Sequence, residues 1–229
     1  MSANETPSKP IAILALDVEL RGENIVDHGM LAIGFCLGRV DQFEVIESGR
    51  ISMSPMHFQS YSKRTMKEFW CLHADVMETL ENEAISAEAA IFAFYAKLRH
   101  FESIYDIRIV SDNTGGDIGS IDYYLTTFDY PPLNYKTLSR SGVLAYRTSA
   151  THIPLEYRPT YDTDGYARGA LGYKYDQPWV SDKAVAAALG IELTNKPTHF
   201  PDDDARYVYE MHVKTVLAVN ARAQRALTV

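Results

Sequence analysis

The sequence predicts one α/β domain built around a mixed β-sheet. Apolar, strand-like segments dominate the first 51 residues, helical patterns follow, and one further strand and several helices complete the chain. A length of 229 residues suits one large domain or two small ones. Nothing in the chain forces a division, so residues 11–229 are expected to form the domain and residues 1–10 a flexible polar tail.

The first three strands are expected to form an antiparallel meander, because only short turn-like stretches join them. The run "IAILALDVE" is typical of a buried strand, and "QFEVIESGRI" alternates like a half-buried one. The expected strands span 11–19, 29–38 and 42–51.

Helices and a fourth strand are expected next. Ser86 is the expected N-cap of one helix, because its hydroxyl can accept a hydrogen bond from the first helical turn. The expected helices span 64–84, 87–101 and 117–128, and the strand spans 107–113.

The segment 131–180 is rich in Pro, Gly and Tyr and has little periodicity, so no element is expected there. Beyond it, Ser181 as N-cap and Gly190 as stop define a short helix. A closing helix runs from about Asp202 into the 220s.

The composition is that of an ordinary globular protein, with 46% hydrophobic and 23% charged residues. The apolar run at 11–16 is too short to cross a bilayer, and the N-terminus lacks the apolar core of a signal peptide. Cys36 and Cys71 are the only cysteines, which excludes a disulfide framework or a four-cysteine zinc site. We therefore expect a soluble cytoplasmic protein with no membrane partner.

The net charge of −8 argues against broad electrostatic wrapping of nucleic acid, which needs a basic face. It is compatible with a local nucleic-acid site. Carboxylates that hold divalent metal ions add negative charge, and the bound ions reverse it locally.

Two acidic residues end the first expected strand. Asp17 and Glu19 are two positions apart, so a strand points both to one face, roughly 6.5 to 7 Å apart along the backbone. Carboxylates this close repel each other unless a positive charge lies between them, and a divalent metal ion can supply it. The alternative is a strand that simply ends at the surface.

A second acidic stretch, "SDNTGGDIGSIDYYL" at 111–125, joins the fourth strand to a helix. Asp117 stands at the helix start beside the sheet edge, and Asp122 follows within the helix. The glycines lack the G-x-G-x-x-G spacing, which excludes a dinucleotide-binding loop. The alternative is an ordinary turn, since Asn and Gly are common turn residues.

A third stretch, "THFPDDDARYVYEM" at 198–211, opens the closing helix. His199 lies in the loop and Asp204 in the first helical turn, with Pro201 fixing the chain between them. The alternative is helix capping: Asp202 or Asp203 caps the helix, all three carboxylates favour its positive end, and His199 is an ordinary loop histidine.

Together, the three stretches give strand-end D-x-E, then N-x-x-x-D, then H-x-x-x-x-D. In order, spacing and setting the chain resembles the DEDDh family of 3′–5′ exonucleases, which have an RNase H-like fold. The segments "NTGGDIGSIDYYL" and "HFPDDDA" carry the resemblance best. It covers residues 11 to about 220 and is nearer to stand-alone exoribonuclease-like and phage or viral enzymes than to polymerase proofreading subunits.

The resemblance implies hydrolysis of phosphodiester bonds at the 3′ end of single-stranded DNA or RNA. It implies that Asp17, Glu19, Asp117 and Asp204 hold two Mg²⁺ or Mn²⁺ ions and that His199 is the general base. Asp17 is expected to bridge both ions and Asp117 to act mainly through water. Two other hypotheses stay open: an inactive exonuclease-like module that binds nucleic acid, and a hydrolase of short or modified nucleotides.

The chain departs from the family pattern at two positions that hold no metal. Leu20 stands where a small hydroxyl residue is usual, and Gly116 where an aromatic is usual. The resemblance implies that both positions lie near the terminal nucleotide of the substrate, so the departures affect substrate contacts rather than metal binding. Asp122 resembles a second acid often present on that helix and is interpreted as structural or as a weak helper.

The segment 135–175 has seven tyrosines, six Lys or Arg and only three acids. Interleaved aromatics and cations suit a single strand, because rings stack on bases and cations meet phosphates. The alternative is a surface loop whose tyrosines pack on the core. The aromatics Trp70, Phe92 and Phe94 are interpreted as core residues, and the six histidines other than His199 as ordinary ones.

Overall fold

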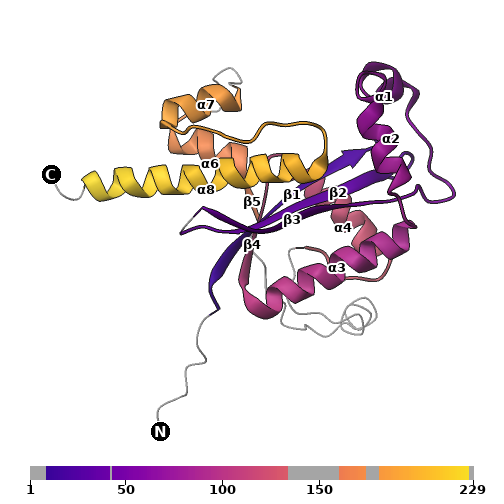
Figure 1. Ribbon diagram of the computed structural model, residues 1–229, viewed down its shortest axis with the longest axis horizontal. Coiled ribbons are helices and arrows are strands. Elements are labelled where there is room, and N and C mark those ends of the chain that lie inside the picture. Colours follow the sequence, from indigo (N-terminus) through magenta and orange to yellow (C-terminus); the bar gives the residue numbers. More distant parts are fainter. Residues whose placement is uncertain (1–8, 42, 134–159, 174–180, 227–229) are drawn as a thin grey trace, which may run out of the picture.

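A five-stranded sheet in the order β3-β2-β1-β4-β5 forms the centre of the computed structural model (Figure 1). The first three strands make the expected antiparallel meander, and β4 and β5 add in parallel next to β1, so the predicted mixed sheet is confirmed. The strands are β1 (Ile11–Leu20), β2 (Met30–Arg39), β3 (Glu44–Ser52), β4 (Asp106–Ser111) and β5 (Thr160–Asp162). The structure describes residues 9–41, 43–133, 160–173 and 181–226.

Helices cover both faces of the central strand β1. Its odd-numbered residues, such as Ile13, pack against α8 (Pro201–Ala226), whereas even-numbered ones, such as Leu14, pack with α3 (Ala87–Ile104) and α4 (Asp117–Thr127). Side chains alternate between the faces of a strand, which explains why β1 reads as a continuous apolar run. The same alternation places Asp17 and Glu19 on the α8 face.

Two short helices lie on the outer side of α8 (Figure 1). The expected helix at 181–190 is confirmed as α7 (Asp182–Leu189): Ser181 accepts from the Ala184 N–H, and Gly190 ends it in the left-handed conformation. Its neighbour α6 (Thr163–Ala170) and the strand β5 were not predicted.

A helical arm stands at the end of the sheet where β1 finishes (Figure 1). The helical region expected at 64–84 is divided into α1 (Lys63–Glu68), η1 (Trp70–Leu72) and α2 (Ala74–Asn82). The division turns Trp70 inward: its side chain is buried, and its indole N–H donates to the Leu20 carbonyl at 3.0 Å.

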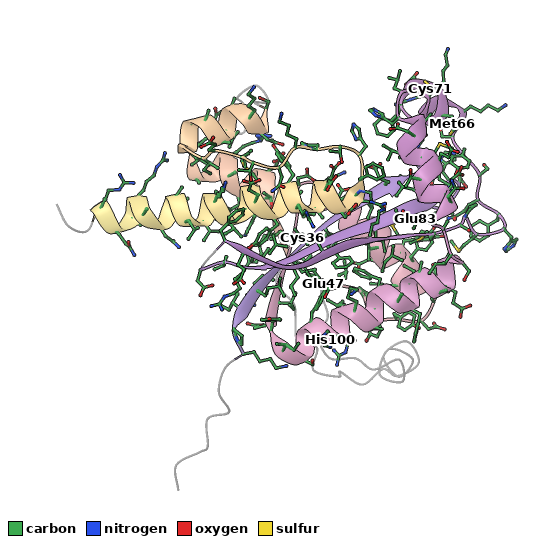
Figure 2. The ribbon with its side chains drawn as sticks, viewed as in Figure 1. Cys36, Glu47, Met66, Cys71, Glu83 and His100 are labelled. Carbon is green, nitrogen blue, oxygen red and sulfur yellow. The ribbon has the colours of Figure 1, made fainter. Side chains whose placement is uncertain are left out.

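The other sequence expectations have mixed outcomes. Ser86 caps α3 as predicted, accepting from the Ala89 N–H. Trp70 and Phe94 are core residues, but Phe92 is 60% exposed, so that prediction was wrong. The two cysteines are free and lie in different parts of the molecule, Cys36 in the sheet and Cys71 on the arm (Figure 2).

Parts of the predicted organisation fall outside the described residues. The N-terminal tail is described only from residue 9, and of the segment 135–175 only residues 160–173 are described. Among the described helices, none combines the length and apolar character needed to cross a membrane.

Candidate active site

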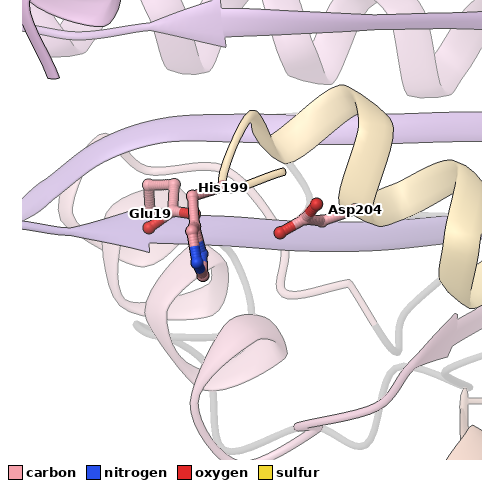
Figure 3. Close-up of side chains that lie close together, drawn as sticks. All are labelled: Glu19, His199 and Asp204. Atoms are coloured by element: carbon pink, nitrogen blue, oxygen red, sulfur yellow. The ribbon is translucent and has the colours of Figure 1, made fainter. Parts of the chain in front are cut away.

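Three elements meet beside the end of β1. The strand contributes Asp17 and Glu19, α4 begins with Asp117, and α8 contributes Asp204 in its first turn. His199 lies in the loop that enters α8. Figure 3 shows Glu19, His199 and Asp204 gathered from the strand, the loop and the helix.

The side chains form two groups of three. Within each group, the potential ligand atoms of the three residues lie within 4.8 Å of one another. One group is Glu19, His199 and Asp204, and the other is Asp17, Asp112 and Asp117. The five residues singled out from the sequence are therefore brought together. Asp112 is an addition that sequence reasoning missed.

Gly34 on β2 allows α8 to approach the sheet closely enough to build this arrangement. It is the register partner of Asp17, and a Cβ placed on it would lie 1.8 Å from the Pro201 carbonyl oxygen. No side chain fits there, so the first turn of α8 rests on the backbone of the sheet. This contact sets the position of Asp204 relative to Asp17 and Glu19.

The three consecutive aspartates of α8 have three different surroundings. Asp202 binds Arg50 at 3.0 Å, and Asp203 accepts from the Thr198 hydroxyl at 2.9 Å. Asp204 accepts from the Thr198 backbone N–H at 2.7 Å while its carboxylate joins Glu19 and His199. The helix begins at Pro201, so Asp202 and Asp203 lie inside its first turn rather than at the cap position.

Asp117 is fixed by the turn that precedes α4. The Ser111 hydroxyl donates to its carboxylate, and its backbone N–H donates to the Asn113 carbonyl at 2.8 Å. The Asn113 side chain accepts from the Gly116 N–H at 3.1 Å and packs so closely that a Cβ on Gly116 would lie 2.3 Å from its amide nitrogen. The departure from an aromatic at position 116 thus has a local structural reason.

Leu20, the other departure from the family pattern, and Asp122, the second acid of α4, both contact residues outside the carboxylate groups. Leu20 packs partly buried against the main core, next to an irregularity in the β1–β2 register. Asp122 accepts from the Leu133 N–H at 2.6 Å and belongs to neither carboxylate group. This contact supports the structural interpretation of Asp122.

The carboxylates are crowded and shielded from water, so their charged forms are disfavoured. Burial, followed by the charges of Asp117 and Glu19, raises the pKa of Asp17 well above its usual range. Burial and Asp204 raise the pKa of Glu19 to about 9. Burial raises the pKa of Asp117 to about 7, although the Ser111 hydroxyl opposes the shift.

His199 has an aromatic neighbourhood on the helical arm. Its ring centroid lies 4.2 Å from that of His73 and 4.9 Å from that of Phe69. Partial burial, and then the nearby His73, lowers the pKa of His199, which favours the neutral form that can accept a proton. The sequence gives His73 no motif partner, because its proximity to His199 depends on how the arm folds back.

The donor set fits hard divalent cations. All ligand candidates are carboxylates apart from one histidine, and oxygen donors suit Mg²⁺ and Mn²⁺. The Asp17 Oδ2 atom is inaccessible to solvent and has no hydrogen-bond partner in the described part of the chain. A buried acceptor left without a donor is costly, and a cation would satisfy it.

Similarity to known proteins is found at the level of structure. A product-bound exonuclease I matches with a TM-score of 0.58 at 14% identity, over 95% of this chain and 45% of that chain. A zinc-bound complex of E. coli exonuclease I with single-stranded DNA matches at 0.57 and 16%, over 96% and 42%. A 3′-exonuclease in a structure on recognition of a histone mRNA stem-loop matches at 0.59 and 11%, over 93% and 84%.

The chain spans less than half the length of the exonuclease I chains that it matches. Neither a protein-family model nor a curated protein matches its sequence significantly. The structural matches confirm the RNase H-like α/β fold, and at 11 to 16% identity they show the fold alone.

Proposed function

We propose that this chain is a metal-dependent 3′→5′ exonuclease that hydrolyses phosphodiester bonds at the 3′ end of single-stranded DNA or RNA. The observation that carries the proposal is the convergence of Asp17, Glu19, Asp117, Asp204 and His199 at one end of β1. The structural neighbours are exonucleases, and one of them is a complex with zinc and single-stranded DNA.

The carboxylates would hold two Mg²⁺ or Mn²⁺ ions. Glu19 and Asp204 would serve one position and Asp117 the other, and Asp17 would serve both, since the charges of both groups act on it. Ions bound there would neutralise the charge on the phosphate and make a bound water easier to deprotonate.

His199 would accept the proton of the attacking water. Its lowered pKa keeps a ring nitrogen available at neutral pH. Phe69 and His73 would orient the ring, and the Thr198 bonds to Asp203 and Asp204 would hold the loop. The chain's own contribution is thus the placement of four carboxylates and one base.

The test uses Mn²⁺ with single-stranded DNA and RNA labelled at either end. A 3′→5′ exonuclease releases a labelled mononucleotide from a 3′-labelled strand at once and shortens a 5′-labelled strand stepwise. Asp17→Ala and Asp117→Ala should each remove activity while the circular dichroism spectrum stays that of the parent. Near-parental degradation by either variant would overturn the residue roles.

Two outcomes would favour the other hypotheses. Tight binding of an oligonucleotide without any cleavage in Mn²⁺ or Mg²⁺ would indicate an inactive binding module. Cleavage restricted to di- and trinucleotides in a length series would indicate a hydrolase of short nucleotides.

A further inference from the structure

Asp112 directly follows β4, and its carboxylate lies within 4.8 Å of those of Asp17 and Asp117. The residues on either side of it are fixed. The Ser111 hydroxyl accepts from the Asn113 N–H at 3.0 Å, and Ser111 also donates to Asp117. The position of Asp112 is therefore set by the same turn that positions Asp117.

The other acids near Asp112 have partners of their own. Asp162 caps α6 by accepting from the Gly165 N–H at 2.9 Å. Asp164 and Asp182 both bind Arg168, at 3.1 and 3.2 Å. For Asp112, by contrast, no other described residue donates a hydrogen bond to the carboxylate or pairs with it as a cation, and the charges acting on it come from acids.

The Asp17 carboxylate gives an independent sign that this group faces a cation. Its Oδ2 atom is shut off from solvent and accepts no hydrogen bond from any described residue. Asp117 is partly satisfied, since Ser111 donates to it. Within this group, Asp17 therefore keeps one oxygen without a donor, and the Asp112 carboxylate has no donor among the described residues other than its own backbone N–H.

We propose that Asp112 is a third carboxylate ligand in the group formed with Asp17 and Asp117. This inference rests on the proposed function and makes it more specific. With two carboxylates, one of them shared, a cation position depends on the phosphate of the substrate for its remaining ligands. A third carboxylate lets this chain hold the second ion before nucleic acid binds.

Calorimetric titration with Mn²⁺ in the absence of nucleic acid tests the proposal. The parent protein should bind two ions. Asp112→Asn, which keeps the shape and removes the charge, should weaken one of them at least tenfold. The matched control Asp202→Asn removes a charge from the same region, where Asp202 binds Arg50, and should keep both ions.

Direct contact is tested with Asp112→Cys and Cd²⁺. A thiolate prefers soft ions, and a sulfur–cadmium bond gives an ultraviolet charge-transfer absorption. The exposed thiol of Cys71 sets the baseline in the parent, and an absorption above this baseline should appear for Asp112→Cys and not for Asp202→Cys. Its absence in a folded Asp112→Cys protein, or Mn²⁺ affinities of Asp112→Asn within twofold of the parent, would overturn the role of Asp112.

Failure of the proposed function has a different signature. A parent protein that binds no Mn²⁺ removes both proposals. A parent that binds two ions and degrades nucleic acid, with Asp112→Asn unchanged in both respects, removes only the role of Asp112.

Discussion

His73 packs its ring against that of His199, with centroids 4.2 Å apart and ring planes inclined by 59°. The two residues come from distant parts of the chain, one from the junction of η1 and α2 and the other from the loop before α8. The ring centroid of Phe69 lies 4.8 Å from that of His73 and 4.9 Å from that of His199. His199 itself has a φ of 63°, a left-handed conformation that a non-glycine residue keeps only with support from its surroundings.

His73→Ala should therefore lower kcat about tenfold with KM changed less than twofold. The ring of His199 would lose its neighbour and spend less time in the orientation needed for proton transfer, and small misplacements near the chemistry are costly. Single-turnover rates on a labelled oligonucleotide would measure this. Leu72→Ala is the control, since Leu72 is adjacent and 73% exposed. An unchanged kcat for folded His73→Ala would mean that the ring contact has no catalytic role.

Metal binding should release protons. At pH 7 the Glu19 carboxyl is largely protonated because its pKa is raised to about 9, and a cation binds the deprotonated form. We expect affinity for Mn²⁺ to rise as pH increases from 6 to 8, by about tenfold per pH unit for each proton released. Calorimetry in two buffers of different ionisation enthalpy measures the number of protons released per bound ion. Equal heats in both buffers would contradict the protonated state of the metal-free site.

The metal-free protein should lose stability as pH rises. The folded-state pKa of Glu19, about 9, lies above its unfolded value of 4.5. Well below pH 4.5 the carboxyl is protonated in both states and does not lower the free energy of unfolding. Its ionisation lowers that free energy progressively as pH rises, and fully above about pH 9. Glu19→Gln removes that cost, and at pH 8 in a chelator it should raise Tm by roughly 2–4 °C, equivalent to about 1 kcal/mol. Thermal unfolding at pH 5 and pH 8 gives the comparison. A larger gain at pH 5 than at pH 8 would reverse the sign and refute the assignment.

The sequence predicts the parts of this molecule that depend on local chemistry. β1, β2 and β4, the caps at Ser86 and Ser181 and the stop at Gly190 all follow from apolar patterns and short-range hydrogen bonds. The short β5–α6 unit is harder to find: Asp162 is a readable cap, but Gly165 and Gly169 weaken the helical signal.

Within the site, the spacing of the motifs and the family resemblance singled out five residues, and the fold places them together. Asp112 and His73 could not be found in the same way. Asp112 is close to Asp17 only because β4 lies parallel to β1, and His73 reaches His199 only because the arm breaks at Phe69 and His73. Both depend on tertiary packing, which leaves no short motif.

Gly34→Ala should disrupt the site through the backbone. The added methyl group would lie 1.8 Å from the Pro201 carbonyl oxygen and 2.0 Å from its carbon, so the start of α8 must move away from β2. We expect a loss of roughly 1–3 kcal/mol in the free energy of unfolding, typical of overpacking, and a fall in activity of about 100-fold. Denaturant titration and nuclease rates measure the two effects.

The matched substitution is Gly119→Ala, because a Cβ there meets no atom within 4 Å. Position 119 lies inside α4, so the substitution should leave the free energy of unfolding unchanged or raise it by up to about 1 kcal/mol. If both variants behaved alike, the close approach of α8 would not be what positions Asp204.

Asp202 and Asp204, two positions apart in the first turn of α8, should have different roles. Successive residues of a helix point about 100° apart, and here Asp204 faces Glu19 and His199 while Asp202 faces Arg50. Asp204→Asn should abolish Mg²⁺-dependent cleavage at nearly unchanged stability. In the parent the Thr198 N–H donates to the Asp204 carboxylate at 2.7 Å. The amide oxygen of the variant can still accept this bond, so the loop that carries His199 stays fixed while the charge is lost.

Asp202→Asn should keep most of the activity. Arg50 retains its pair with Glu83 at 2.8 Å, so the substitution weakens one partly exposed ion pair and costs about 0–1 kcal/mol. Cleavage rates and unfolding midpoints of the two variants, measured side by side, decide the matter. Comparable kinetic losses at equal folding would mean that the carboxylates of this turn serve the helix end in general, and that Asp204 has no special role at the site.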